Sequence, residues 1–174
     1  AQKPDPSPST ADTNAVADAV RLADHWLDET TVLTSGVVTT AAWSRAEWIE
    51  STAPVWRGLV EPVAGSIVSG MGDSLPEEAK AMAGPLMGML GQAGGAMFGA
   101  QVGSALGELS SDVLTASDIG LPLGPEGKAA MLTDNVATFA KGLTGVSYDD
   151  VLLYLALREA AHQRLFAQVP WLRR

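Results

Sequence analysis

The sequence predicts an all-α, mostly helical protein with at most a minor strand element. Apolar residues recur at helical spacing in several segments, residues that favour helix N-caps precede two of them, and turn-rich stretches separate them. The chain of 174 residues is long enough for one domain with a sizeable core, and 47% hydrophobic against 18% charged residues excludes wholesale disorder. We expect about six or seven helices.

The N-terminal segment is predicted to differ from the rest of the chain. Residues 1–12 contain three prolines, which favour an extended or disordered linker. Residues 13–174 are then expected to form a single helical domain. Because Trp171 follows a strong helix at the C-terminal end, we interpret this domain as the N-terminal or central part of a longer protein.

The first predicted helix runs from about residue 13 to residue 29. Val16, Val20 and Leu27 recur at helical spacing, with acidic and basic residues between them. Thr13 or Asp12 is expected to cap this helix. The predicted helix also carries His25, which we interpret as an exposed residue or a hydrogen-bonding partner instead of a metal ligand.

Residues 30–40 are rich in β-branched residues and are interrupted by glycine, so they predict a loop or one short strand. A second helix is expected over residues 41–51 and a third from Pro54 onward. Pro62 lies inside that third pattern and predicts a kink or a break. The tryptophans of this region are interpreted as core anchors.

A Gly-rich central helix is predicted within residues 81–107, a run of 27 residues without a charged side chain. Glycines at every fourth position would form a smooth stripe on one helix face: Gly95, Gly99, Gly103 and Gly107. Such a stripe allows close helix packing in a membrane or in a protein core. We favour a buried helix hairpin over membrane insertion, since no Lys/Arg cluster flanks the run. Self-association through this stripe is an alternative.

The C-terminal third begins with a turn-rich loop over residues 117–128 that lacks the lysine-threonine pair of a phosphate-binding loop, so it does not predict a nucleotide site. A helix is expected over 129–142. Ser147 is predicted to cap the last helix, over about 148–169, with Asp150 completing an approximate capping box.

The last helix carries polar residues on an apolar stripe, where Arg158 and His162 lie one turn apart. A buried arginine needs a carboxylate or another acceptor. Glu159 and His162 have the spacing of the second half of H-E-x-x-H, in which two histidines bind zinc and the glutamate polarises water. Arg158 stands at the first histidine position, and arginine is no metal ligand. The residues alone leave open a zinc site or a packing network.

Three strings in residues 22–31, 43–65 and 155–173 resemble an actinobacterial family of zincin-like hydrolases, and the L-R-E-A-A-H string is the most specific of them. The resemblance covers essentially the whole chain and implies a zinc-dependent metallopeptidase-like hydrolase. It implies Glu159 as general base and His162 as a metal ligand, with Arg158 at the lost first-ligand position of a degenerate motif. Family members extend beyond this C-terminus, where a further ligand would lie.

Composition limits the partners and cofactors. A net charge of −9 argues against nucleic acid and against an anionic membrane surface. The lack of cysteine excludes disulfides, thiol catalysis and Cys-ligated zinc, and with two histidines a metal site needs carboxylates or another chain. We favour a zincin-like, metal-dependent hydrolase with an impaired centre. The alternatives are a catalytically inactive scaffold or binding protein, and a self-associating protein that uses the glycine stripe. No signal sequence is evident, so the expected compartment is the cytoplasm.

Overall fold

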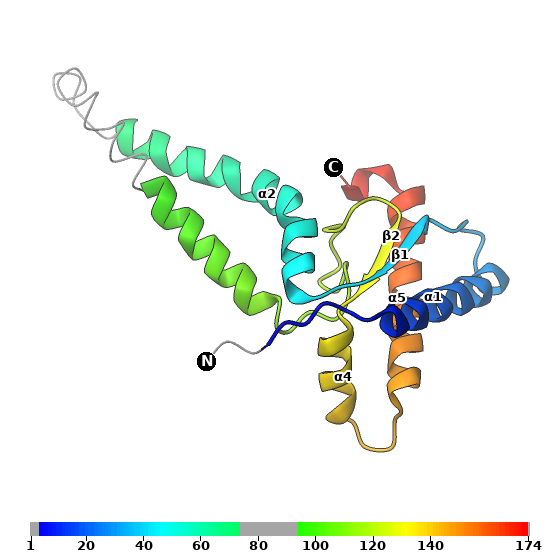
Figure 1. Ribbon diagram of the computed structural model, residues 1–174. Coiled ribbons are helices and arrows are strands. Elements are labelled where there is room, and N and C mark those ends of the chain that lie inside the picture. Colours follow the sequence, from blue (N-terminus) through cyan, green and yellow to red (C-terminus); the bar gives the residue numbers. More distant parts are fainter. Residues whose placement is uncertain (1–3, 74–93, 174) are drawn as a thin grey trace. The chain divides into compact units, whose positions relative to one another are not determined.

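The computed structural model describes residues 4–73 and 94–173, and it confirms a mostly helical fold with a minor sheet (Figure 1). Its named elements are α1 (Thr10–Thr30), β1 (Thr39–Ala42), α2 (Arg45–Asp73), β2 (Lys128–Met131), α4 (Thr133–Lys141), α5 (Tyr148–Gln168) and the 3-10 helix η1 (Pro170–Arg173). Residues 94–109 are also helical.

The chain divides into two compact units. The first unit comprises residues up to Thr52 together with those from Leu109 onward, and the second comprises residues 53–108. The boundary lies within α2, between Thr52 and Ala53. The sheet, α1, α4 and α5 all belong to the first unit.

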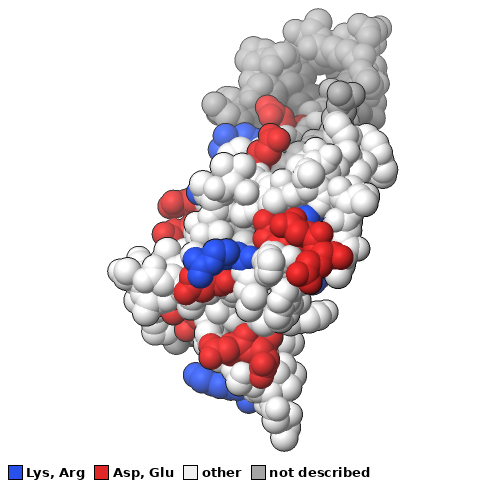
Figure 2. Space-filling view, turned by 90° about the vertical axis from the view of Figure 1, so that its right-hand side faces the viewer, with Lys and Arg blue, Asp and Glu red and all other residues white. Residues whose placement is uncertain are grey.

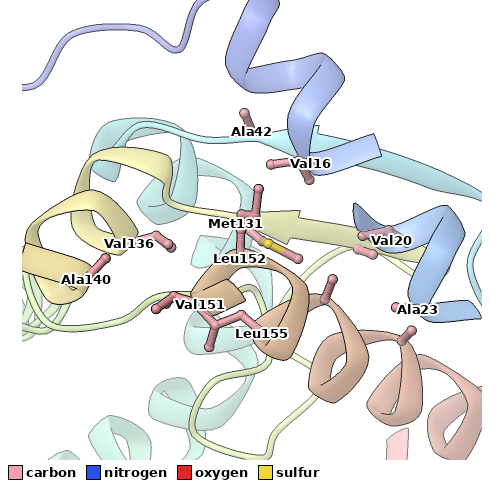
Figure 3. Packing of buried hydrophobic residues seen from close by; sticks show 13 residues of the cluster. Val16, Val20, Ala23, Ala42, Met131, Val136, Ala140, Val151, Leu152 and Leu155 are labelled. Atoms are coloured by element: carbon pink, nitrogen blue, oxygen red, sulfur yellow. The ribbon is translucent and has the colours of Figure 1, made fainter. Parts of the chain in front are cut away.

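The core of the first unit lies between the sheet and the helices α1 and α5. β1 and β2 pair in parallel, from Thr39 opposite Lys128 to Ala42 opposite Met131. Figure 3 shows the apolar side chains of α1, α4 and α5 converging on Met131 of β2. Burial of these aliphatic side chains, at roughly 25 cal/mol for each Å² of apolar area, is the main source of stability for this unit.

The strand β2 lies where the sequence predicts the start of a helix at residue 129. The segment Lys128–Met131 is extended and pairs with β1, and Ala129, Ala130 and Met131 are fully buried. Alanine and methionine favour helices, so the local propensity of this segment is helical. The hydrogen bonds to β1 and the burial of the three side chains nevertheless make it a strand. Helix α4 therefore begins only at Thr133.

Helix α1 begins at Thr10, three residues earlier than predicted. Its N-cap is Ser9, whose hydroxyl accepts the Asp12 N–H at 3.2 Å, while the Asp12 carboxylate accepts the Ser9 N–H at 2.8 Å. Asp12 is thus the third helical residue of a capping box instead of the cap itself.

Helix α2 is one continuous helix, although the sequence predicts two helices in this region and a kink or a break at Pro62. Pro54 and Pro62 both lie inside it. Its start is fixed by hydrogen bonds between Ser44 and Glu47 in a capping-box arrangement, at 2.7 and 3.2 Å. Each proline removes one helical donor, and the remaining hydrogen bonds carry the helix past that gap.

The N-terminal segment contacts the start of α2. The Asp5 carboxylate accepts the backbone N–H groups of Arg45 and Ala46, at 3.0 and 2.9 Å, and pairs with the Arg45 guanidinium. Although burial opposes it, these hydrogen bonds lower the pKa of Asp5 below its usual value. The carboxylate therefore satisfies donors that the first turn of a helix leaves unpaired.

The described part of the Gly-rich segment is exposed instead of buried. Residues 81–93 of the predicted run lie outside the described residues, and 94–109 form a helix in the second unit. The four glycines of the stripe are exposed, and among the described atoms none lies within 4 Å of a Cβ built on any of them. Every helix in the described ranges is too short or too polar to cross a bilayer.

Candidate functional site

Helix α5 carries the candidate site and runs through the core of the first unit. Ser147 caps it as predicted, with hydrogen bonds to and from Asp150 at 3.1 and 3.2 Å. Apolar residues of α5 face β2, α1 and α4. Arg164 fixes the far end of the helix: its guanidinium is almost fully buried and bonds Asp24 and Asp28 of α1.

The partner of α5 at the site is a segment that we call the site loop, residues 114–118. Two backbone hydrogen bonds attach it to β2 and to Leu132, the residue that follows β2: Ala116 N–H donates to the Ala130 carbonyl and Leu132 N–H to the Leu114 carbonyl, each at 2.9 Å. The site loop is therefore held by the sheet on one side while its last two residues contact α5.

Glu159 is completely buried, and its carboxylate is used as a hydrogen-bond acceptor. One oxygen, Oε2, accepts the Ser117 hydroxyl at 2.6 Å and the Ser117 backbone N–H at 3.2 Å. The other, Oε1, accepts the Gln163 amide at 3.0 Å. These three donors compensate the cost of burying a carboxylate and join the site loop to the helix.

His162 lies one turn along the helix and contacts the same serine. Its Nδ1 is 2.7 Å from the Ser117 hydroxyl oxygen. Because that hydroxyl donates its proton to Glu159, the serine oxygen accepts from Nδ1–H, and the lone pair of the imidazole ring is then on Nε2. Nε2 has no hydrogen-bond partner among the described residues. Burial lowers the pKa of His162; the charge of Glu159 opposes this shift, Arg158 adds to it and Asp118 opposes it.

Arg158 is held by Asp118, the last residue of the site loop. One guanidinium nitrogen donates to the Asp118 carboxylate and the other to the Asp118 backbone carbonyl. The second carboxylate oxygen of Asp118 accepts the Leu114 N–H at 2.9 Å. The arginine side chain is 35% exposed and that of the aspartate 21%, so the pair lies at the edge of the core.

Sequence reasoning brought Arg158, Glu159 and His162 together and required an acceptor for the arginine. It did not identify Ser117, Asp118 or Gln163. Ser117 and Asp118 are 40 or more positions from their partners in the sequence and belong to a segment that reads as a turn-rich loop. The only available signal was the general requirement that a buried arginine and a buried glutamate find partners. The glycine stripe belongs to the second unit and forms no part of this network.

The residues at this site do not fit a zinc centre. Tetrahedral zinc sites use three or four His, Cys or carboxylate ligands. Among the described residues, no group of three such side chains is arranged to hold a metal ion. The Glu159 carboxylate accepts three protein hydrogen bonds, and a cationic guanidinium stands at the position where H-E-x-x-H has its first histidine.

The acidic character of the chain is visible on its surface. On the face shown in Figure 2, Asp and Glu side chains gather in several patches with Lys and Arg side chains between them. This distribution agrees with the net charge of −9.

Comparison with protein-family models gives one finding that covers the whole chain. The model of a family described as zincin-like metallopeptidase matches residues 1–174. No curated protein and no solved structure matches the chain.

Proposed function

This chain belongs to the zincin-like metallopeptidase family, and we propose that it is a degenerate member that serves as a scaffold or binding protein. In this proposal Glu159 stands at the general-base position, His162 at a ligand position, and Arg158 at the lost first-ligand position. The proposal includes the assignment to an actinobacterial branch with R-E-A-A-H, supported by residues 158–162.

The observation that carries the proposal is the engagement of all three motif residues with the site loop. A general base must reach water or substrate, whereas Glu159 is fully buried and accepts three protein hydrogen bonds. A zinc ligand must offer a lone pair, whereas Arg158 offers only donors and binds Asp118.

A second candidate is an active metallopeptidase whose remaining ligands lie outside the described residues. The hydrogen bond between Nδ1 of His162 and Ser117 favours it, because a ligating histidine typically donates its other ring N–H to a fixed acceptor and binds the metal through the remaining nitrogen, here Nε2. The two candidates differ in one property, which is zinc-dependent hydrolysis.

A peptidase assay with the purified full chain separates them. We expect no cleavage of a fluorescence-quenched peptide library, either as purified or with one equivalent of zinc. Glu159→Gln is the control, since it keeps the hydrogen-bonding shape and removes the base. Cleavage that is abolished by a chelator and by Glu159→Gln would establish the active enzyme and overturn the proposal.

A further inference from the structure

We propose that a cavity beside the start of α4 binds an alkylguanidinium, the group that an arginine side chain carries. The cavity has a volume of about 200 Å³, and all its lining residues belong to the first unit. The lining residues include Arg45, Asp112, Leu114, Asp134, Asn135 and Phe139. None of the three motif residues of α5 lines this cavity, so the inference goes beyond the proposed function and does not depend on it.

Asn135 presents an acceptor atom that has no partner. The residue is only 8% exposed, and its amide nitrogen donates to the Ser110 carbonyl at 2.9 Å and to the Val113 carbonyl at 2.7 Å. Because both of these partners are acceptors, they fix which end of the amide is nitrogen and which is oxygen. Oδ1 accepts no hydrogen bond from the described residues and is not one of their enclosed polar atoms, so a donor in the cavity can reach it.

Two carboxylates make the cavity negative. Asp112 and Asp134 line it, both are exposed, and neither pairs with a cation in the described ranges. Arg45 also lines the cavity, but its charge is already balanced: Nε donates to the Asp5 carboxylate at 3.1 Å, and the guanidinium donates to the Pro4 carbonyl as well. The two aspartates are therefore left to attract a cation.

The mixture of acceptors and apolar surface fits a guanidinium. This group carries five N–H donors in one plane, so it can bond carboxylates and an amide oxygen together, and it is more weakly hydrated than an ammonium. The ring of Phe139, which is 47% exposed, and the side chain of Leu114 offer apolar surface to the plane and to the alkyl stem. A metal ion fits less well, since no group of three His, Cys, Asp or Glu side chains in the described part of the chain is arranged to hold one.

A titration of the full wild-type chain followed by nuclear magnetic resonance tests the proposal. The ligand is N-acetylarginine amide, and N-acetylcitrulline amide is the matched control because it has nearly the same shape without the charge. We expect a dissociation constant of about 1 mM for the arginine derivative and at least about tenfold weaker binding of the citrulline derivative. The side-chain amide signals of Asn135 should shift as the arginine derivative binds. Equal binding of the two ligands, or no binding of the arginine derivative, would overturn the proposal.

Two double variants with the same change in charge test the carboxylates. Asp112→Asn with Asp134→Asn removes both charges from the cavity, whereas Asp18→Asn with Glu29→Gln removes two exposed charges from α1. We expect about fivefold weaker binding in the first variant and unchanged binding in the second. Equal weakening in both would show that only the net charge of the chain matters and would overturn the proposal. The comparison of the two ligands in the wild-type chain stands on its own if a variant does not fold.

Two further ligands distinguish the sources of the guanidinium. Tighter binding of a capped pentapeptide with arginine between glycines than of N-acetylarginine amide would support an arginine of a partner chain. Tighter binding of agmatine, which has the guanidinium and its stem without a peptide backbone, would support a free small molecule.

Discussion

Ser117 is the residue on which the site network depends. Its hydroxyl contacts Glu159 and His162, and its backbone N–H bonds the same glutamate. With Asp118 beside it on Arg158, two consecutive loop residues hold three residues of α5.

Removal of the serine hydroxyl is expected to destabilise the fold. Ser117→Ala leaves Oε2 of the buried Glu159 with one donor fewer, and we expect a loss of about 2–3 kcal/mol in the free energy of unfolding. Urea denaturation measures it. Ser7→Ala, at an exposed position, is the control and should change stability by less than about 0.5 kcal/mol. Equal effects of the two substitutions would contradict the network.

His162 predicts a pH dependence of stability. Burial lowers its pKa in the folded chain below the value of about 6.5 in the unfolded chain. The unfolded chain therefore binds a proton more readily, so the contribution of the neutral imidazole is present above pH 6.5 and is lost as the pH falls toward the folded-state pKa. Glu159, Arg158 and Asp118 are the charged groups that act on it.

Thermal melts between about pH 7 and pH 5 measure this dependence. The wild-type melting temperature should fall over this range by more than that of His162→Gln, which cannot titrate. Parallel curves for the two proteins would show that His162 does not gain a proton on unfolding.

At the scale of elements, α5 is fixed to α1 by one buried arginine. Arg164 is 1% exposed and donates to the carboxylates of Asp24 and Asp28 and to backbone carbonyls of Asp24 and Leu33. Burial alone would lower its pKa, but the hydrogen bonds that it donates to Asp28 and Asp24, together with their negative charges, outweigh this effect and raise it. The pairing holds two helices that are more than 130 positions apart in the sequence.

Substitution of this arginine is expected to be costly. Arg164→Met keeps the length of the side chain but leaves the half-buried Asp24 without its cation, and we expect a loss of about 3 kcal/mol or more. Arg21→Met is the matched control, since Arg21 is exposed and pairs with Asp18 within α1. Its effect should stay below about 1 kcal/mol. Denaturant unfolding that ranks the two variants in the opposite order would refute the assignment.

The elements show what the sequence could and could not predict. Helices α1 and α5 follow from apolar periodicity, and the Ser147 cap follows from local chemistry. β2 could not be predicted, because its residues favour helix and only the pairing with β1 makes them extended. Gly36 illustrates the same limit: a Cβ there would lie 2.1 Å from the Gln163 carbonyl oxygen, a close approach between segments that no local pattern reveals.

At the candidate site too, the residues of one helix could be predicted from the sequence, whereas their partners from another segment could not. The motif residues Arg158, Glu159 and His162 are adjacent on one helix and were found from spacing alone. Their partners Ser117 and Asp118 come from a loop whose approach to α5 is fixed by its hydrogen bonds to β2. The need for partners was predictable from the cost of burying charge, but their identity required the tertiary structure.

At the scale of the molecule, the site and its supporting network lie entirely in the first unit. The residues that connect α5, the site loop and β2 belong to the segments before residue 53 and after residue 108. The account of the site therefore depends on the structure of that unit alone. Its central claim is that the unit keeps the zincin-like helix while Arg158 and Asp118 form an ion pair where a metal ligand would be needed.

The zinc content of the tag-free wild-type chain tests this claim most directly. It is measured by inductively coupled plasma mass spectrometry after extensive dialysis. The account predicts far less than one zinc per chain, with the same result for His162→Ala. About one zinc per wild-type chain, lost in His162→Ala, would contradict it and would identify the chain as a metal-binding member of its family.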